Sequence, residues 1–496
     1  MTRTSLLFAG TAILCLFFAD FEILTLNPWQ ELRRMAQGVL TPDFLAVYEI
    51  KVAFLNTITF AFCGIFLAIL SGSILAFCFE FRPVRLFCAF IRAIHEIFWA
   101  IIFLPVVGLN STCGILAIAI PYAGIFAKVF AEIRQESDQL PLKGLPPHSH
   151  PISKFFFGVF PVIYADLKHY SSYRLECGLR SSAILGFIGL PTLGFHLETA
   201  FREGTYSQAA AILFCFYLLI ASLKYWVKEK AVLFYVVLSF IVISKEITFS
   251  WNNIIRFFTY EILPWPMRRA GVSDGSYSLE FAPGQVWAWI ETVMMEEGFP
   301  GLWNTLILTQ IVLVGTGVLT LMVFPLVSRH FQERWPRRIS SYLLIVIRTT
   351  PEYILAYIFL QLWGPSMLPA ILAIGLHNGA IISHLSGQNA DLVRLKVDAP
   401  RKKVNLYFFE ILPRVYGQFL AFLFYRWEVM MRESAILGIL GLYTLGFYID
   451  SAMSDDKMDK AILLIVITAM LNMGIDSTSQ IVRRRLKISS KLATSS

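Results

Sequence analysis

Residues 173–195 read YRLECGLRSSAILGFIGLPTLGF, and residues 425–447 read YRWEVMMRESAILGILGLYTLGF. The two stretches share a charged start, a Ser-Ala-Ile-Leu-Gly centre and a Thr-Leu-Gly-Phe end, in the same order. A match of this length indicates an internal duplication. Both copies also carry Arg and Glu within an apolar chain, and ionisable residues inside membrane spans are candidates for function.

The duplication extends upstream of these stretches. An Asn-Thr pair recurs at residues 56–57 and 304–305, and a Phe-Phe pair followed by a proline recurs at residues 156–161 and 408–413. Between them, residues 91–118 align with residues 347–374 without a gap. The sequence therefore predicts two homologous halves, residues 1–228 with a core at 51–226 and residues 229–496 with a core at 300–485. An even number of spans in each half makes this a parallel repeat.

The composition is typical of a polytopic membrane protein. Hydrophobic residues make up 56% of the chain and charged residues 15%, and the mean hydropathy is +0.63. Apolar stretches of roughly 20 residues, the length that crosses a bilayer as a helix, recur along both halves. They begin near residues 6, 52, 98, 114, 155 and 209, and again near residues 231, 302, 343, 367, 408 and 461. The predicted fold is all-α, with about twelve membrane spans of this length.

The net charge of +8 is explained by membrane orientation rather than by a nucleic-acid partner. Lys and Arg concentrate in short segments between the apolar stretches, as they do in the cytoplasmic loops of membrane proteins. This distribution places both termini in the cytoplasm and the stretch 249–300 on the outer side. The apolar N-terminal run lacks a signal-peptide cleavage site, so we expect an uncleaved first span.

Three stretches resemble a known family. Residues 92–109 contain Arg-Ala-Ile-His-Glu-Ile-Phe-Trp-Ala and then Val-Gly-Leu, residues 114–120 read Gly-Ile-Leu-Ala-Ile-Ala-Ile, and residues 425–438 contain Tyr-Arg-Trp-Glu, Arg and Ala-Ile-Leu-Gly. In these motifs the chain resembles two fused permease domains of ATP-binding-cassette importers, specifically the phosphonate-importer permeases. The resemblance implies the type I importer permease fold and a bacterial inner-membrane location. It also implies separate ATPase subunits, expected as a homodimer, and a solute-binding protein on the outer side.

The same resemblance assigns the segments 133–155 and 387–407 to cytoplasmic ATPase docking. The family motif has Glu-Ala-Ala, then Gly, then Leu-Pro, and Pro161 and Pro413 match its last position. His148 and Pro400 stand at the glycine positions, and neither copy keeps Glu-Ala-Ala. The first segment also carries several prolines, which lack the amide donor that a helix needs. We therefore expect either docking that differs between the halves or an unusual ATPase.

The charged residues of the duplicated stretches have two interpretations. Glu and Arg stand four residues apart in each copy and can pair on one helix face. The pairs either only make the charges tolerable in the membrane, or their arginines line a translocation path and attract an anion, since guanidinium forms bidentate hydrogen bonds with phosphonate or phosphate oxygens. The predicted path residues are Arg174, Glu176, Arg180, Ser182, Arg426, Glu428, Arg432 and Ser434.

Glycines follow each charged segment. They are Gly186, Gly189 and Gly194 in the first copy and Gly438, Gly441 and Gly446 in the second. Glycines of this kind serve close helix packing or a bend. Their place after a charged helix also suits a gate, and both interpretations stay open.

Metal, cofactor and catalytic sites are not expected. His148 and His150 lie in a loop without carboxylate or thiolate partners, and the seven cysteines form no Cys-x-x-Cys pair. His377 and His384 are interpreted as satisfying buried hydrogen bonds. The chain has no Gly-x-x-x-x-Gly-Lys-Ser/Thr motif, so we expect ATP hydrolysis on a separate subunit.

The sequence thus predicts the permease component of an ATP-binding-cassette importer, with a path for phosphonate, phosphate or a similar small oxyanion. The alternative is a secondary transporter or channel that works without an ATPase, which the altered docking segments favour.

Overall fold

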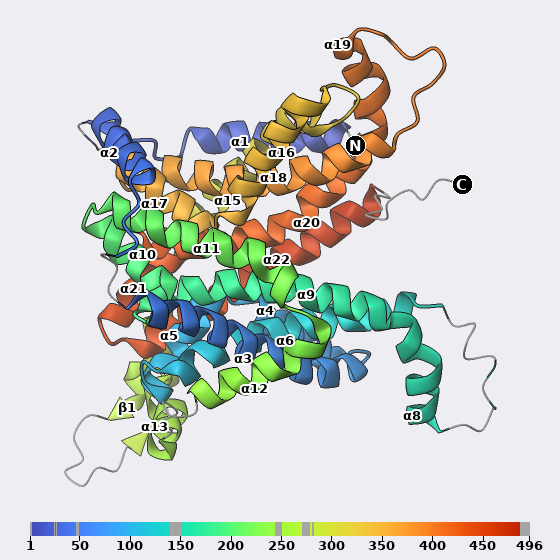
Figure 1. Ribbon diagram of the computed structural model, residues 1–496. Helices are drawn as coiled ribbons and strands as arrows, with labels where there is room; N and C mark the ends of the chain where they lie inside the picture. Colours follow the sequence, from blue (N-terminus) through green and yellow to red (C-terminus); the bar gives the residue numbers. More distant parts are fainter. Residues whose placement is uncertain are drawn as a thin grey trace. The chain divides into compact units, whose positions relative to one another are not determined.

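The computed structural model describes residues 2–23, 25, 27–45, 49–138, 144, 146, 150–243, 250–269, 278–279 and 282–486. Over these residues the chain is helical except for loops and a two-residue antiparallel pair, β1 (Arg268–Arg269) with β2 (Ser278–Leu279) (Figure 1). It divides into two compact units, residues 35–261 and residues 1–34 with 262–496. The predicted all-helical fold is confirmed.

The unit of residues 35–261 is built on α3 (Ile50–Phe77) and α6 (Ser111–Glu136), which pack along each other. Small residues allow this approach, because a Cβ at Gly72 would lie 2.6 Å from the Cβ of Phe126. The unit's other helices are α2 (Pro28–Leu40, from residue 35), α4 (Arg82–Ala93), α5 (Glu96–Val107), α8 (Pro151–Lys154), η1 (Phe155–Val159), α9 (Phe160–Ile184), η2 (Leu185–Ile188), α10 (Leu193–Arg202), α11 (Tyr206–Trp226), α12 (Glu229–Ile243), α13 (Trp251–Arg256) and η4 (Phe257–Glu261).

The other unit repeats the main helices from α3 to α11 in the same order. α15 (Phe299–Val327) packs along α18 (Met367–Leu392), as α3 does along α6. Leu308, Val312, Ile374 and Met430 are fully enclosed in its apolar core. Its other elements are α1 (Thr2–Leu16), η5 (Trp265–Met267), α14 (Pro283–Val293), η6 (Met294–Gly298), α16 (Arg334–Thr349), α17 (Glu352–Trp363), α19 (Lys403–Asn405), η7 (Leu406–Ile411), α20 (Leu412–Ile439), α21 (Leu445–Ser454) and α22 (Met458–Arg485).

Each unit contains a right-angle break between two helices. α4 and α5 meet at 91°, and α16 and α17 meet at 92°. His95 and Pro351 are the N-caps of α5 and α17, and both have extended backbone dihedrals. Pro351 lacks an amide donor and so cannot continue α16, whereas the His95 ring accepts a hydrogen bond from the amide of Ile97. The apolar stretches that begin near residues 98 and 343 therefore belong to sharply bent helix pairs, which suit either a broken span or a re-entrant loop.

The number of spans follows from helix length and charge. Six helices among the described residues are long and apolar enough to cross a membrane, or up to nine if each bent pair is one span. One of the six is continuous from Pro283 to Val327, so it starts inside the predicted outward stretch. The prediction of twelve also counts α1 and α12, of 15 residues each, and α20, which is 28 residues long but carries several charges.

The first apolar helix of each predicted half packs in the unit built by the other half. α1 lies against α15, and the amide nitrogen of the Gln310 side chain donates to the carbonyl of Phe8 at 3.1 Å. α12 lies against α3, where the rings of Phe66 and Phe240 are 6.3 Å apart. The repeat boundary at 228/229 stays a prediction, and the compact units do not follow it.

Candidate functional site

The duplicated stretches form the C-terminal parts of two long helices, α9 and α20. Each helix follows a π-helical segment, η1 or η7, and has Pro161 or Pro413 in its first turn. Proline has no amide hydrogen to donate to the preceding turn, so the hydrogen-bond register shifts there. The two copies thus share their local structure as well as their sequence.

Two arginines of α9 contact side chains of their own helix. Arg180 Nη2 lies 3.4 Å from Glu176 Oε1, which is the predicted pair four residues apart. Arg174 Nε donates to the hydroxyl of Tyr170 at 2.7 Å, and its guanidinium carbon lies 5.5 Å from the ring centroid of Tyr173. Aromatic faces attract a guanidinium. These arginines are half-buried, so their donors are partly shielded from water.

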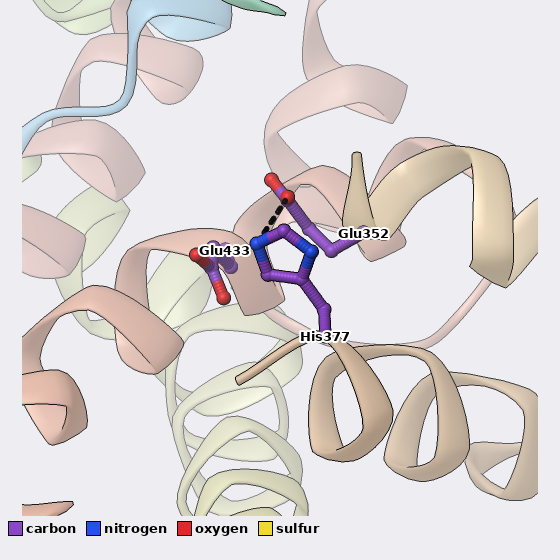
Figure 2. Close-up of side chains that lie close together, drawn as sticks. All are labelled: Glu352, His377 and Glu433. Atoms are coloured by element: carbon purple, nitrogen blue, oxygen red, sulfur yellow. Dashed lines mark ion pairs between the residues drawn. The ribbon is translucent and has the colours of Figure 1, made fainter. Parts of the chain in front are cut away.

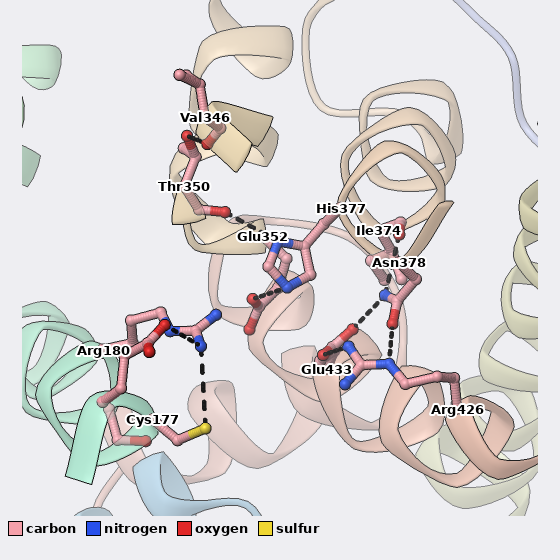
Figure 3. Close-up of polar contacts among 12 residues, drawn as sticks. Cys177, Arg180, Val346, Thr350, Glu352, Ile374, His377, Asn378, Arg426 and Glu433 are labelled. Carbon is pink, nitrogen blue, oxygen red and sulfur yellow. Dashed lines mark hydrogen bonds and ion pairs between the residues drawn. The ribbon is translucent and has the colours of Figure 1, made fainter. Parts of the chain in front are cut away.

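The α20 arginine that corresponds to Arg174 has different partners. Arg426 Nε donates to Asn378 Oδ1 at 2.6 Å, and Arg426 Nη2 lies 3.3 Å from Glu433 Oε1 (Figure 3). Asn378 Nδ2 donates to Glu433 Oε2 at 2.8 Å, which closes the triad. The pairing of Glu428 with Arg432 stays a prediction.

Sequence reasoning missed Asn378 and Glu433. Glu433 is seven residues beyond Arg426, outside the spacing of four that the search for pairs used. A signal was present, because Glu433 corresponds to Ser181 within stretches that otherwise match closely. Because only one copy has a carboxylate at this position, the two halves differ electrostatically.

Each unit buries a carboxylate at the start of the helix after its right-angle break. Glu96 of α5 accepts a hydrogen bond of 2.6 Å from the hydroxyl of Ser181, and its other oxygen lies 3.4 Å from His95 Nε2. Glu352 of α17 is the equivalent residue, and its carboxylate lies 3.8 Å from His377 Nε2 (Figure 2). His377 Nδ1 is 2.9 Å from the carbonyl oxygen of Thr350. The expected buried hydrogen bond of His377 is therefore confirmed, and His384 contacts Gln388 at 3.2 Å.

The two predicted path serines are fully buried. Ser182 donates to the carbonyl of Thr57 at 2.8 Å and so ties α9 to α3. Ser434 donates to the carbonyl of Met431 in its own helix at 2.7 Å. Both hydroxyls contact backbone carbonyls, which is a packing role, and their place in a path stays a prediction.

The glycines after α9 and α20 build two equivalent turns. Gly189 and Gly441 have φ of 91° and 94°, the left-handed region that favours glycine. A Cβ at Gly194 would lie 1.8 Å from the carbonyl oxygen of Ala183, and one at Gly446 would lie 1.9 Å from that of Ala435. A Cβ at Gly186 or Gly438 would lie 2.1 Å from the backbone nitrogen of the residue after Gly194 or Gly446. These contacts explain the 51° bend between α9 and α10, while the gate stays a prediction.

Of the four predicted docking residues, Pro161, Pro400 and Pro413 are described, and Pro161 and Pro413 lie in the first turns of α9 and α20. His148 lies outside the described residues. Pro400 lies in residues 393–402, which contain no helix although they are all described. This segment is held by Glu410, whose Oε1 accepts from the amide of Lys396 at 3.2 Å and lies 2.8 Å from Arg414 Nη2. Gly158 occupies the matching position in the first half, so this anchor belongs to the second half alone.

No family model matches the chain. The phosphate-import permease protein PhnE of Mycolicibacterium smegmatis is 24% identical over 434 residues, covering 82% of this chain and 77% of that relative. The phosphite transport system permease protein PtxC of Stutzerimonas stutzeri is 23% identical over 222 residues, 42% of this chain and 81% of that relative. A solved amino acid ABC transporter covers 42% of this chain at 17% identity, with a TM-score of 0.34.

The coverage distinguishes two kinds of relative. PhnE aligns with most of this chain, whereas PtxC uses most of its own length to match less than half of it. The putative cryptic phosphonate transport system permease protein PhnE2 of Escherichia coli is a third relative, 27% identical over 99 residues. Together with the repeated order of elements, this coverage indicates two permease units in one polypeptide. The chain is therefore similar along most of its length to a phosphate-import permease, and in parts to phosphite- and phosphonate-transport permeases.

Proposed function

We propose that this chain is the membrane permease of an ATP-binding-cassette importer and forms the path for a small oxyanion, either phosphonate, phosphite or phosphate. The observation that carries the proposal is the similarity to a phosphate-import permease along 82% of the chain. Buried or half-buried arginines at matching places in α9 and α20 support it, because guanidinium groups bind tetrahedral oxyanions through paired hydrogen bonds.

The proposed partners follow from this role. Separate ATPase subunits, as a homodimer, dock on the segments 133–155 and 387–407, and a solute-binding protein delivers the oxyanion to the outer surface that includes residues 249–300. The chain lies in the bacterial inner membrane with both termini in the cytoplasm. ATP hydrolysis takes place on the partner subunits, and the lipid bilayer surrounds the spans.

The proposal also covers how the path holds its solute. Arg174, Arg180, Arg426 and Arg432 supply the positive charge, and Glu176 and Glu433 share part of it, since each contacts an arginine at 3.4 or 3.3 Å. Partial neutralisation keeps the attraction weak enough for release, which a conducting path requires. The glycine turns after α9 and α20 act as the gate in this scheme.

Reconstitution tests the proposal directly. Proteoliposomes that contain the chain, its ATPase and its binding protein should hydrolyse ATP faster with methylphosphonate, phosphite or phosphate than with sulfate. Arg174→Gln should raise the half-saturating oxyanion concentration about tenfold or more, the loss of a charge-assisted hydrogen bond, and Arg34→Gln at an exposed helix position should not. Failure of all three oxyanions to stimulate hydrolysis would overturn the proposal. Oxyanion uptake in liposomes that lack the ATPase would favour a secondary transporter, the function that the non-helical segment 393–402 suggests as an alternative.

A further inference from the structure

Three donor side chains converge beside the Arg426–Glu433 pair. Glu352 of α17, His377 of α18 and Glu433 of α20 each offer one ligand atom, and these atoms all lie within 4.8 Å of one another (Figure 2). The three residues are buried, with exposures of 8%, 2% and 7%. They come from three separate helices of one unit, so their convergence is a property of the tertiary structure. Attraction of an oxyanion by arginines does not account for it.

The orientation of His377 is set by the backbone. Its Nδ1 lies 2.9 Å from the carbonyl oxygen of Thr350, which can only accept a hydrogen bond. In the neutral ring, Nδ1 therefore carries the hydrogen and the Nε2 lone pair faces the two carboxylates. The 3.8 Å between Nε2 and Glu352 Oε2 is too long for a hydrogen bond. Histidines that bind metals are commonly held in this way, with one nitrogen on a carbonyl and the other on the ion.

Glu433 is also held in place by neighbouring groups, and the backbone just before Glu352 is anchored. Asn378 Nδ2 donates to Glu433 Oε2 at 2.8 Å, and Asn378 Nδ2 is itself fixed by the carbonyl of Ile374 at 3.0 Å (Figure 3). The Thr350 hydroxyl donates to the carbonyl of Val346 at 2.8 Å, which anchors the chain at the break before α17. Such supporting hydrogen bonds orient metal ligands and tune their affinity.

We propose that Glu352, His377 and Glu433 form a binding site for one divalent transition-metal ion of the zinc class. One imidazole nitrogen and two carboxylate oxygens are donors that such ions accept, and a fourth position stays open to water. Ligand atoms around a tetrahedral ion with bonds of about 2.0–2.1 Å are about 3.3 Å apart, so the carboxylates close in by up to about 1.5 Å on binding. The bound ion cross-links α17, α18 and α20.

The site is confined to one half of the chain. The positions that correspond to His377 and Glu433 are Pro121 and Ser181 in the first half, so only the glutamate of the set is repeated, as Glu96. We therefore expect one ion per chain, although the fold is duplicated. The proposal does not depend on which solute is transported, although Glu433 also contacts Arg426.

Metal binding to the full-length chain tests this inference. The protein is purified in lipid nanodiscs through a tag without histidine, stripped with a chelator and titrated with Co²⁺. We expect one Co²⁺ per chain with the intense visible absorption of a four-coordinate site, and displacement of that ion by Zn²⁺. Elemental analysis of the untreated protein identifies the metal ions that it carries after purification.

Variants distinguish this site from others on the surface. His377→Gln and Glu352→Gln should abolish the Co²⁺ absorption, and Asn378→Leu should weaken binding by about 10–100-fold, as loss of a supporting hydrogen bond does. His384→Gln, on the same helix, should bind as the unaltered chain does. Size-exclusion profiles show whether each variant is folded. Absence of stoichiometric Co²⁺, or equal binding by folded His377→Gln, would overturn the proposal, and neither result bears on oxyanion-stimulated ATP hydrolysis.

Discussion

At the residue scale, the two halves use different means to hold an arginine in a membrane helix. Arg426 faces the carboxylate of Glu433, whereas Arg174 faces tyrosine rings and the Tyr170 hydroxyl. A buried ion pair is costly to form, but removing one partner is costlier still, because it strands a buried charge. Single and double substitutions of the Arg426–Glu433 pair should therefore differ sharply in their effect on the free energy of unfolding.

A double-mutant cycle measures this difference. Arg426→Gln or Glu433→Gln alone should lower the free energy of unfolding by about 3–5 kcal/mol, and the double variant should lose clearly less than the sum. The pair of Glu176 and Arg180 is the control, because the Glu176 side chain is 41% exposed, and its coupling energy should be below about 1 kcal/mol. Denaturant titration of the purified chain supplies both values. Additive losses at Arg426 and Glu433 would contradict the pairing.

At the element scale, each long helix ends in a turn that only glycine allows. Because Gly194 and Gly446 have no Cβ, α10 and α21 can lie directly against backbone carbonyls of α9 and α20. A Cβ at Gly194 would lie 1.8 Å from such a carbonyl oxygen, and one at Gly446 would lie 1.9 Å from it. A backbone carbonyl cannot move aside as a flexible side chain can. The repeated Gly-Leu-x-Thr-Leu-Gly pattern therefore encodes a fixed angle between two helices.

Alanine at these positions should destabilise the protein. Gly194→Ala and Gly446→Ala should each cost at least about 1–3 kcal/mol, the usual range for overpacking. Gly315→Ala in α15 is the control, since a Cβ there meets no atom within 4 Å. Thermal unfolding in detergent compares the three. Equal stability of all three variants would show that the turn tolerates a side chain.

The segment after α18 is an element without helical structure that is nevertheless anchored. Glu410 is buried and holds the amide of Lys396, while Arg414 Nη1 donates to the carbonyl of Arg394 at 2.8 Å. If an ATPase docks on this segment, the anchor transmits its movement to α20. The first half has a glycine at the position of Glu410, so coupling there must use other contacts.

Glu410→Ala should therefore uncouple solute from ATP hydrolysis. We expect solute-stimulated hydrolysis to fall several-fold while the chain remains folded in the membrane. Asp398→Ala is the control, because Asp398 is exposed in the same segment. ATPase assays of the reconstituted importer, with and without oxyanion, make the comparison. Unchanged stimulation in Glu410→Ala would exclude this anchor from coupling.

At the scale of the whole molecule, the sequence predicts most of the fold and less of the site. Duplication and apolar length predict the order of helices because both are properties of local sequence. The cluster of Glu352, His377 and Glu433 could not be found this way, since its members are far apart in the chain and meet only through the break before α17. Arg426 was identified from the repeat, but its partner Glu433 lies at a spacing that a search for pairs four residues apart does not reach.

Because α1 and α12 each pack in the unit built by the other half, the two halves should still assemble when they are made as separate fragments. Fragments 1–228 and 229–496, expressed together, should copurify, because the first carries α1 and the second carries α12, and each of these helices packs in the other fragment's unit. Removing residues 1–23 from the first fragment should weaken this association, since Phe8 packs against Phe424 with ring centroids 5.2 Å apart. Affinity purification through a tag on the second fragment measures recovery of the first. Equal recovery without residues 1–23 would contradict the role of α1.

The same packing has a consequence for biosynthesis. α1 precedes its neighbour α15 by almost 300 residues, and α15 is complete only when residue 327 has been made. This apolar helix of 15 residues therefore has no α15 to pack against while the whole first half is translated. A chain that ends before residue 299 would therefore leave α1 without the helix against which it packs.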